Sequence, residues 1–583
     1  MDVQKLRALA ATRAQNPFDG DSVVVDYDDY LVAKVNPLEA DRMRLVLGVR
    51  YNRNRDVWVM PATRSQFAQL RGVFGRRLEL TQAAHDHLEQ LTPDPGHWDT
   101  SPDLYPFQAE GVNRMLNAGS MLVGDEMGTG KTIQAIEWMR LRAENSPHRG
   151  SLNLVVCPNS MKHKWQDELW RWWPGCTPIV VDGTASQRRK QITYSNEHED
   201  PVIVINYDGL KAHTRLASWG GKALTEKQKE DKELNQFEWT SLVIDEAHKI
   251  KNPKAQITMA VKQMGLHADE RLAMTGTPLL QDPDDVWSIM NFVAPAEWGS
   301  RNQFRTRYCD MVIGWSSGLE NSGLKADTLK EFDEFFQPRF VRRTKVEVLP
   351  QLPEKFPIEY RALHMGTAQA RAYKAMVKDM MAMFKDELLI TDNSLAQITA
   401  LRQAASASLD VRDGKVWNME APSCKLDALR DLIAEAPGDP IVVYAESRKL
   451  IELFNRELAK DGLVCGMITG KQGPAVRAKT VEAFQNGDID VILGTLGAGA
   501  EGLTLTRANR IVIAQQSWSH GVNAQAIDRV HRIGQTRGVQ PIVLVTLGTI
   551  DEATALADLD KEVKLQQLVR DPAWLAAAMI GKT

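Results

Sequence analysis

The sequence predicts an α/β protein that has two lobes built on parallel sheets, helical insertions and a small N-terminal α/β module. Three observations indicate this fold class. A chain of 583 residues is too long for one hydrophobic core. Short β-branched runs alternate with helical stretches, which is typical of a parallel sheet with crossover helices. This alternation occurs in two blocks, and the region between them is rich in Ala, Met, Leu and Lys.

The predicted N-terminal module covers residues 1–90. Its apolar runs at 23–27 and 30–34 indicate short strands, and residues 57–60 form another after the turn-prone Asn52-Arg-Asn-Arg55. A stretch rich in Pro and Gly follows, so residues 91–103 are predicted to be a linker.

The predicted first lobe covers residues 104–345 and includes a helical insertion at about 281–340. Its strands are expected at 121–123, 154–156, 202–205 and 242–244. Two polar segments, around 185–200 and 211–237, are expected to be surface insertions.

Residues 346–420 are expected to form a helical insertion or linker, and residues 421–560 the second lobe. Strands of the second lobe are expected at 441–444, 491–493, 510–513 and 542–545. Residues 561–583 are expected to form a C-terminal helix.

Composition is that of an ordinary soluble globular protein, with 43% hydrophobic residues, 25% charged residues and a formal net charge of −4. Any basic surface must therefore be local. The five cysteines form no C-x-x-C pair, which argues against a disulfide framework or a zinc site. Neither a signal-peptide core nor an apolar run near 18 residues is present, so we expect an intracellular, soluble protein without a membrane partner.

A glycine loop with a lysine reads Gly124-Asp-Glu-Met-Gly-Thr-Gly-Lys-Thr132 and lies between an apolar run and a helical stretch. In such a loop, backbone N–H groups of Gly128, Thr129 and Gly130 approach phosphate oxygens at a helix N-terminus. Lys131 would reach the β- and γ-phosphates, and the Thr132 hydroxyl would ligate Mg²⁺. The strict pattern has Gly where this chain has Asp125. A chance glycine turn before a helix is the alternative.

Two adjacent acids, in Ser241-Leu-Val-Ile-Asp-Glu-Ala-His248, follow a buried strand. Asp245 is placed to hold Mg²⁺, and Glu246 is placed to polarise the attacking water as a general base. The alternative is a strand-end turn with solvated charges.

A third segment, Gln525-Ala-Ile-Asp-Arg-Val-His-Arg-Ile-Gly-Gln535, lies some four hundred residues downstream of the glycine loop. Arg529 and Arg532 could neutralise the charge of a bound nucleotide from across a cleft. Two distant halves that share one ATP are typical of a motor protein. The alternative places these arginines on a solvated helix.

Longer stretches around these motifs resemble the Swi/Snf family of ATP-dependent DNA translocases, within the superfamily II helicases. They are the DEAH segment that begins at Asp245, Met274-Thr-Gly-Thr-Pro278, Val341-Arg-Arg-Thr-Lys-Val-Glu-Val-Leu349, Leu352-Pro-Glu-Lys355 and the segment at 525–535. The resemblance covers about 104–552 and implies two RecA-like lobes that use ATP and Mg²⁺.

The resemblance also implies roles for single residues around the nucleotide. Gln108 matches an adenine-side motif, and its amide can both donate to and accept from adenine; a capping Gln at a helix start is the alternative. Gly502 matches the ATP site. The residues implied to couple hydrolysis to lobe movement are His248, which is otherwise a structural histidine, Thr275, Gly276, Thr277 and Gln525.

For DNA, the family uses loops at the ends of strands in both lobes. The matching positions are Pro158, Asn159, Ser160, Asn206, Tyr207, Thr469, Gly470 and Thr495. Hydroxyl, amide and backbone N–H groups bind phosphate without reading bases, so little sequence specificity is expected. Each residue type is also common in ordinary turns.

Departures from the family pattern are Ala445-Glu446, Ala500, Leu280 and Trp518-Ser-His. None of them removes a catalytic group, although they leave the DNA contacts less well defined.

The N-terminal module carries nine arginines between Arg42 and Arg77 against one acid, Asp56, with aromatic residues interleaved. Residues 49–61 resemble the substrate-recognition modules of HARP-type annealing helicases. We therefore expect DNA contacts from Arg50, Arg53, Arg55 and Trp58, and selection of forked or junction DNA. In the alternative, the aromatics form the core of a small domain and the arginines a solvated face.

Together these patterns predict a monomeric DNA-dependent ATPase that moves on duplex or forked DNA in replication, recombination or repair, in a bacterial or phage-infected cell. A conventional strand-separating DNA or RNA helicase and a non-catalytic DNA-binding scaffold are the alternatives.

Overall fold

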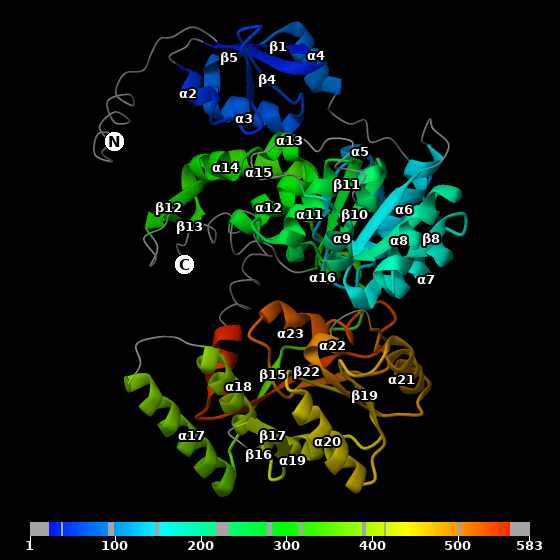
Figure 1. The fold of residues 1–583 in the computed structure, drawn as a ribbon, viewed down its shortest axis with the longest axis vertical. Coiled ribbons are helices and arrows are strands. Elements are labelled where there is room, and N and C mark those ends of the chain that lie inside the picture. Colours follow the sequence, from blue (N-terminus) through cyan, green and yellow to red (C-terminus); the bar gives the residue numbers. More distant parts are fainter. Residues whose placement is uncertain are drawn as a thin grey trace.

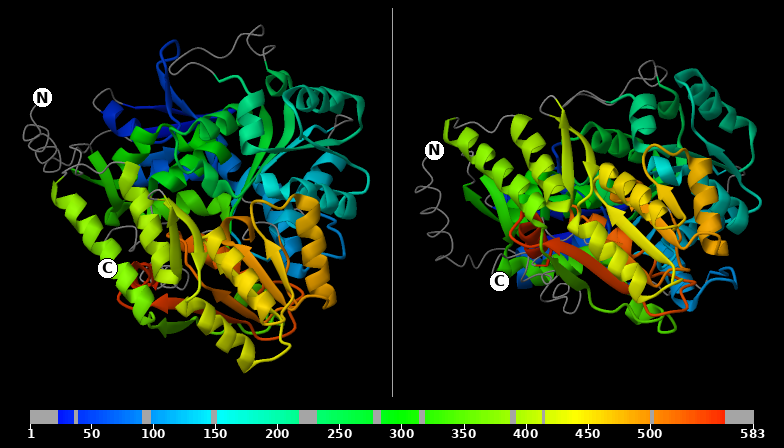
Figure 2. Two further views of the ribbon diagram at one scale, coloured as in Figure 1. Left: turned by 60° about the horizontal axis from the view of Figure 1, so that its bottom comes forward. Right: turned by 90° about the horizontal axis from the view of Figure 1, so that it is seen from below.

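The computed structural model of the chain describes residues 23–35, 39–90, 98–145, 151–216, 232–276, 283–313, 319–386, 392–412, 415–499 and 503–559. Its elements form three tiers along the longest axis (Figure 1): the N-terminal module, the first lobe and the second lobe. When the bottom of this view is turned forward, the second lobe overlaps the first (Figure 2).

The N-terminal module is built on a sheet in the order β3-β4-β2-β1-β5. The strands are β1 (Val23–Asp28), β2 (Tyr30–Lys34), β3 (Arg50–Asn52), β4 (Val57–Met60) and β5 (Leu78–Leu80), and the helices are α2 (Ala40–Met43), α3 (Arg64–Phe74) and α4 (Gln82–Gln90). The alternation in β1 buries Val23 and Val25 and exposes Val24, as the strand period requires. The three predicted strands are confirmed.

The module packs directly on the first lobe through α3 and α15 (Leu329–Phe336). Ser65 Oγ donates to the Phe335 carbonyl oxygen at 3.0 Å, and Gln66 Nε2 lies 3.4 Å from the Glu297 carbonyl oxygen. Gly48 has φ +74°, and a Cβ there would lie 1.8 Å from the Ala296 carbonyl oxygen. Only glycine fits this contact, so backbone meets backbone across the interface.

The first lobe contains a wholly parallel sheet in the order β14-β6-β11-β10-β7-β9-β8. The strands are β6 (Met121–Val123), β7 (Asn153–Cys157), β8 (Thr177–Val180), β9 (Pro201–Asn206), β10 (Trp239–Asp245), β11 (Ala268–Met274) and β14 (Phe340–Val341). The central strands are buried on both faces, which explains their continuous apolar runs. The four predicted strands are confirmed, whereas β11 begins with charged residues and β14 has two residues, so neither gives an apolar run.

Helices cover both faces of this sheet, as Figure 1 shows. They are α5 (Pro106–Ala118), α6 (Lys131–Glu144), α7 (Lys162–Trp172), α8 (Ala185–Tyr194), α9 (Tyr207–His213) and α11 (Gln256–Gly265). The insertion adds α12 (Pro283–Val293), α13 (Pro295–Trp298), α14 (Arg301–Tyr308) and α15. It also contains an antiparallel hairpin, β12 (Cys309–Ile313) and β13 (Leu319–Leu324), which corrects the expectation of a purely helical insertion.

The second lobe has its own wholly parallel sheet, in the order β15-β22-β21-β18-β20-β19. The strands are β15 (Glu359–Leu363), β18 (Ile441–Ala445), β19 (Cys465–Ile468), β20 (Val491–Thr495), β21 (Arg510–Ile513) and β22 (Gln540–Thr546). The helices include α19 (Cys424–Glu435), α20 (Arg448–Lys460), α21 (Pro474–Asn486), α22 (Leu496–Gly499) and α23 (His520–Ile527). Two such parallel-sheet lobes and the N-terminal module confirm the predicted fold class.

Residues 346–420 do not form a separate linker, because β15 is an edge strand of the second sheet. The segment also holds α16 (Lys345–Val348), α17 (Thr367–Asp386), α18 (Asp392–Ser406) and the hairpin β16 (Ser408–Arg412) and β17 (Lys415–Glu420). The edge strand Glu-Tyr-Arg-Ala-Leu is half-buried and partly charged, so the sequence carries little signal for it. The C-terminal helix expected at 561–583 lies outside the described residues.

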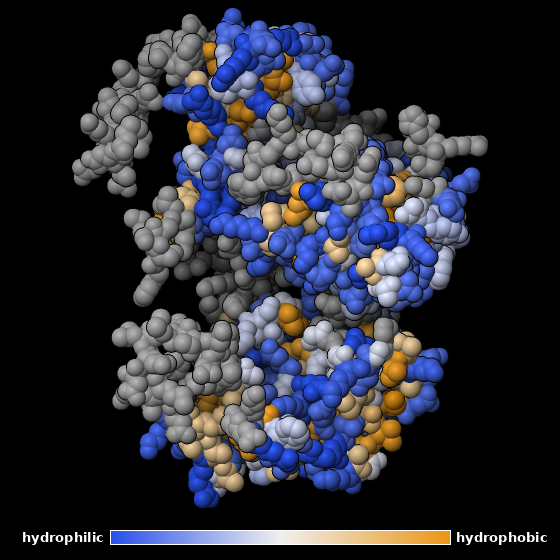
Figure 3. All heavy atoms as spheres, viewed as in Figure 1, coloured by the Kyte–Doolittle hydropathy of each residue, from blue (hydrophilic) through white to orange (hydrophobic). Residues whose placement is uncertain are grey.

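The visible face of all three tiers is mainly hydrophilic, and hydrophobic side chains show only as small patches (Figure 3). Among the helices of the described residues, none combines the length and the apolar character needed to cross a membrane.

Candidate functional site

The glycine loop connects β6 to α6, as expected. Gly128 and Gly130 have φ of +82° and +85°, a left-handed conformation that favours glycine. Lys131 Nζ donates to the carbonyl oxygens of Asp125 and Glu126, at 2.6 and 3.1 Å. The loop thus leads directly into the N-terminus of α6, where Lys131 and Thr132 lie. The backbone N–H groups of a helix N-terminus, together with a lysine, favour the binding of an anion.

Asp125, the departure from the glycine pattern, is fully buried and has a clear partner. Its Oδ2 accepts from Arg343 Nη2 at 2.6 Å, and its Oδ1 accepts from the Arg343 backbone N–H at 3.0 Å. Backbone bonds flank this pair, from Gly124 N to the Val341 oxygen at 2.7 Å and from Glu126 N to the Arg343 oxygen at 2.9 Å. The loop is therefore clamped to residues 341–343, at the end of the first lobe.

Asp245 ends β10 next to the loop, and both of its carboxylate oxygens are oriented. Trp165 Nε1–H donates to Oδ2 and the Glu246 backbone N–H donates to Oδ1, each at 3.0 Å. Burial, followed by the charge of Glu246, raises the pKa of Asp245 to about 6. A divalent cation would keep this carboxylate ionised.

Glu246 has φ +56°, a strained conformation for a residue other than glycine. Burial by itself raises the pKa of Glu246, but His248, Lys131 and Arg529 outweigh it and hold this pKa below its usual range. His248 Nδ1 lies 3.3 Å from Glu246 Oε2. His248 is therefore in contact with the proposed base.

The predicted coupling segment lies against the glycine loop. Thr275 is buried and its N–H donates to the Val123 carbonyl oxygen at 3.0 Å. A Cβ on Gly276 would lie 3.2 Å from Lys131 Nζ. Gln525 is buried in α23. Thr277 and Gly502 lie outside the described residues.

Arg532 of the second lobe reaches the glycine loop of the first. A Cβ on Gly128 would lie 2.9 Å from Arg532 Cβ. Both arginines follow α23 in a turn, not in a helix. Burial, then Arg529, lowers the pKa of Arg532 to about 10, and burial, then Arg532 and Arg529, lowers the pKa of Lys164 to about 8. Three crowded cations at the glycine loop suit a polyanionic ligand.

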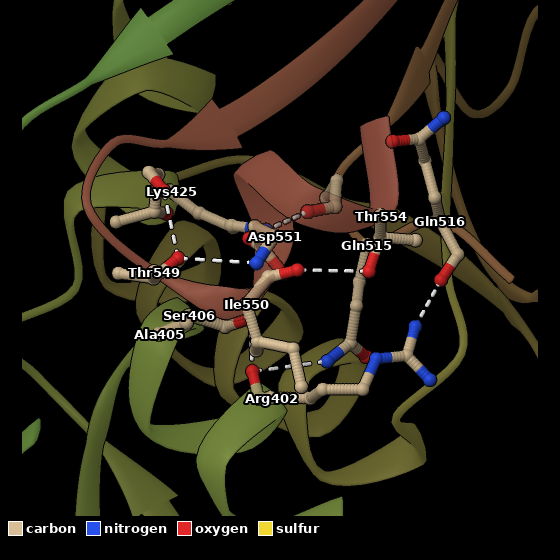
Figure 4. A network of polar contacts seen from close by, with 12 residues as sticks. Arg402, Ala405, Ser406, Lys425, Gln515, Gln516, Thr549, Ile550, Asp551 and Thr554 are labelled. Carbon is tan, nitrogen blue, oxygen red and sulfur yellow. Dashed lines mark hydrogen bonds and ion pairs between the residues drawn. The ribbon is translucent and has the colours of Figure 1, made fainter. Parts of the chain in front are cut away.

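A buried polar network holds the segment before α23 within the second lobe (Figure 4). Lys425 is fully buried; its Nζ donates to the Ala514 carbonyl oxygen at 2.6 Å and forms an ion pair with Asp551. Gln515 Nε2 donates to the Arg402 carbonyl oxygen at 3.2 Å. The network thereby fixes the segment that leads from β21 to α23.

Gln108 has the alternative role of a helix cap. Its Oε1 accepts from the Tyr105 backbone N–H at 3.0 Å, and its Nε2 donates to the Thr129 carbonyl oxygen at 2.9 Å. The side chain is 2% exposed. It links the start of α5 to the glycine loop, and contact with adenine stays a prediction.

The predicted DNA contacts divide by exposure. Asn159, Ser160 and Gly470 are exposed and Asn206 is half-buried, each just beyond the carboxyl end of a strand or at that end. Buried positions are Pro158, Tyr207, Thr469 and Thr495. Tyr207 OH donates to the Asp245 carbonyl oxygen at 2.5 Å, and Thr469 Oγ1 donates to Gln472 Oε1 at 2.6 Å. The hydroxyl groups of both side chains are thus bonded within the protein, and contact of these two positions with DNA stays a prediction.

In the N-terminal module, Arg50, Arg53 and Arg55 are exposed around the β3–β4 turn. Trp58 is 8% exposed and lies in the hydrophobic core with Phe67 and Phe74, which corrects its assignment as a DNA contact. Acids from outside the arginine-rich window partly neutralise it. Such pairs are Arg55 with Asp28, Arg44 with Asp41 and Arg77 with Glu39.

Sequence reasoning missed Lys164, Trp165 and Arg343 as parts of the site. Lys164 and Trp165 lie in the first turn of α7, shortly after the strand-end positions 157–160, which include three predicted DNA contacts. Arg343 lies within residues 341–349, one of the segments on which the family resemblance rests, but no sequence pattern links it to Asp125.

The residues present fit ATP and Mg²⁺. Among the described residues, no group of three or more His, Cys, Asp or Glu could hold a metal by itself. Mg²⁺ is commonly bound by one or two protein oxygens together with phosphates and water. Asp245 and Thr132 are suited to that role, beside the cations Lys131, Lys164, Arg529 and Arg532.

Comparison with protein families gives two matches. Residues 107–408 match the SNF2-related domain, and residues 424–534 match the helicase conserved C-terminal domain.

The individual relatives share about a quarter of their aligned residues with this chain. Protein CHROMATIN REMODELING 24 of Arabidopsis thaliana is 26% identical and aligns with 77% of this chain and 45% of its own length. The putative ATP-dependent helicase/translocase YwqA of Bacillus subtilis is 26% identical, with 81% and 49% covered. The chain spans about half the length of these relatives. A solved structure, the Sulfolobus solfataricus SWI2/SNF2 ATPase core in complex with dsDNA, is 26% identical and covers 82% of this chain and 96% of its own, with a TM-score of 0.37.

Restoring the glycine pattern should destabilise the protein. Asp125→Gly leaves the Arg343 guanidinium without its buried partner, which costs about 3 kcal/mol or more. We expect a lower melting temperature by calorimetry. Adding Arg343→Leu should recover part of the loss, because the unpaired charge is then removed. An unchanged melting temperature for Asp125→Gly would contradict this role of the pair.

Asp245→Asn should alter the pH dependence of stability in metal-free buffer. The pKa of Asp245, about 6 in the folded chain, lies above the value of 3.8 that is usual for an aspartate in an unfolded chain, so the ionised carboxylate destabilises the folded state above pH 6. This cost, on the order of 3 kcal/mol, is relieved as the pH falls through that pKa. The melting temperature of the variant relative to wild type should therefore decrease between pH 7 and pH 4.

The change of the melting-temperature difference with pH is the diagnostic quantity. A constant contribution to this difference is expected in any case, because the Asn side chain lacks one of the two hydrogen-bond acceptors of Asp245. Asp208→Asn, which changes an exposed carboxylate of the same lobe, is the control. A difference between Asp245→Asn and wild type that stays constant with pH would refute the prediction.

Proposed function

The chain belongs to the family of proteins that share the SNF2-related domain, and we propose that it is an ATP-dependent translocase that moves on duplex or forked DNA. One observation carries the proposal: the glycine loop of the first lobe and the arginine turn of the second meet, with Arg532 Cβ 2.9 Å from a Cβ on Gly128. A nucleotide at this junction would contact both lobes. Its hydrolysis would therefore change the equilibrium between closed and open arrangements of the two lobes.

The residues of the first lobe have distinct roles in the proposed reaction. Lys131 and the start of α6 bind phosphate oxygens, and Thr132 and Asp245 hold Mg²⁺. When bound, ATP supplies the phosphoryl group and Mg²⁺ neutralises its charge. Glu246, which His248 and Lys131 keep ionised, accepts a proton from the attacking water.

The second lobe completes the proposed site. Arg529 and Arg532 stabilise the charge that develops on the transferred group, as arginine fingers do. Thr275 and Gly276 transmit a movement of Lys131 on nucleotide binding or hydrolysis to the rest of the lobe, since Gly276 lies against the Lys131 ammonium group.

For DNA, the exposed positions Asn159, Ser160, Asn206 and Gly470 support contact with phosphates, because small polar groups bind a backbone without reading bases. They lie at or near the carboxyl ends of strands in both sheets. Alternating closure and reopening of the lobes would then advance the protein along one strand.

The exposed Arg50, Arg53 and Arg55 of the N-terminal module are proposed to select forked or junction DNA. Because the module packs against α15, deletion of residues 1–95 would uncover buried surface of the first lobe. Point substitutions are therefore the better test.

The proposal predicts ATP hydrolysis that duplex DNA stimulates, most strongly with a fork. Lys131→Ala and Glu246→Gln should abolish turnover. Arg532→Ala should retain nucleotide binding but lose about 10³-fold in kcat. Steady-state assays without DNA and with single strands, blunt duplex, fork or RNA measure this, with the exposed Lys460→Ala as control.

Stimulation by single strands or RNA alone would favour a conventional helicase. No turnover under any condition would favour a non-catalytic DNA-binding scaffold.

The role proposed for the N-terminal module predicts a selective effect of Arg50→Ala with Arg53→Ala. The double variant should lose several-fold affinity for forks and keep duplex-stimulated ATPase, because its arginines contact only the selected structure. Arg42→Ala with Arg44→Ala is a matched control, since acids on α2 and just before it already pair with these exposed arginines. Equal losses on duplex and fork would contradict the proposal.

A further inference from the structure

Residues 341–345 form the last part of the first lobe before the chain enters the second. Phe340 and Val341 pair with Leu122 and Val123, directly before the glycine loop. The Lys345 N–H donates to Glu126 Oε2 at 2.8 Å. The backbone at Lys345 is therefore fixed relative to the phosphate-binding loop.

The side chain of Lys345 points into the other lobe. Its Nζ donates to Asp528 Oδ1 at 2.8 Å and to the His531 carbonyl oxygen at 2.6 Å. It is 2% exposed, and α16, which begins at Lys345, lies at the side of the first lobe that faces α22 and α23 (Figure 1). Lys345 thus connects the glycine loop with the turn that carries the arginines.

The two partners of Lys345 bracket the proposed arginine fingers. Asp528 precedes Arg529, and His531 precedes Arg532. Beside the position of a Cβ on Gly128 lie Arg532 Cβ at 2.9 Å and Lys345 Cε at 3.4 Å. The stem of Lys345 therefore packs in the same contact that brings the arginine turn to the loop.

We infer that Lys345 is a positioning residue: it sets the distance between the arginine turn 528–532 and the phosphate-binding loop and so determines when the nucleotide site is complete. The inference rests on the proposed ATPase function. Lys345 does not contact the reacting atoms; it acts through Arg529 and Arg532. A misplacement of about 1 Å in such a geometry can cost about 100-fold in rate.

Charge and burial make the contact specific. Burial lowers the pKa of Lys345, while Asp528 and Glu126 act in the opposite direction. Burial raises the pKa of Asp528, but Lys345 and Lys355 outweigh it and hold that pKa below its usual range. Removing either partner would leave the other buried and charged, so the pair favours one fixed geometry of the lobes.

The turn is also held from a second side. His531 Nε2–H donates to the Pro353 carbonyl oxygen at 2.8 Å, beyond α16 on the same connecting segment. Lys355 Nζ lies 3.8 Å from Asp528 Oδ1, but its side chain is 40% exposed. Lys355 therefore offers a matched control with the same charge and the same partner, at a longer distance and on a more exposed side chain.

The test compares Lys345→Met, Asp528→Asn, the double variant and Lys355→Met. We expect the kcat for ATP to fall 10- to 100-fold in both single variants, while KM changes less than about threefold, because binding groups stay in place. The double variant should have a kcat no lower than that of either single variant, because each single substitution already removes the same contact between Lys345 and Asp528. Lys345→Arg should restore part of kcat, and Lys355→Met should change it less than twofold.

Hydrogen–deuterium exchange gives a readout that does not depend on activity. Lys345→Met should accelerate exchange in residues 526–535 without affecting β18 and β20, whereas general destabilisation would accelerate exchange throughout the lobe. If Lys345→Met does not fold, Asp528→Asn provides the same comparison.

A folded Lys345→Met with wild-type kcat and unchanged exchange at 526–535 would overturn the inference. Wild-type protein without ATPase activity would instead refute the proposed function, and the exchange measurement would still decide the role of Lys345.

Discussion

The pairing of the buried Asp125 with Arg343 is the interaction on which the rest of the site depends. A buried carboxylate requires a partner, and this one comes from the end of the first lobe, more than two hundred residues away. The same segment supplies backbone bonds to the glycine loop and places Lys345 at the lobe boundary. One constraint therefore fixes the loop, its strand neighbour and the start of the second lobe.

Charge is distributed unevenly across the junction of the lobes. Asp245 and Glu246 place negative charge in the first lobe, and Arg529 and Arg532 of the second lobe lie close to Lys164 of the first. Burial and this crowding of cations lower the pKa values of Lys164 and Arg532. Like charges disfavour each other's ionised form, and an opposite charge nearby offsets that cost. The proposed magnesium–nucleotide complex would match this distribution, because it carries both a cation and anionic oxygens.

The N-terminal module is part of the architecture of the first lobe. Its α3 helix shares buried contacts with α15, and Gly48 allows backbone to approach backbone. A DNA structure bound by the exposed arginines would therefore act on a surface that is continuous with the lobe, so that recognition and movement can be coupled mechanically.

The sequence by itself determined the strands with continuous apolar runs and the glycine loop before α6, because local patterns encode a buried strand and a phosphate-binding turn. It did not reveal β14 or β15, whose pairing depends on distant neighbours, or that Trp58 and Tyr207 face inward. Only the tertiary structure gave Asp125 its partner, bonded Gln108 to the Thr129 carbonyl oxygen of the glycine loop and brought Arg532 to Gly128. Those contacts join residues far apart in the chain, and burial, which no local pattern records, decides whether each charge must be paired.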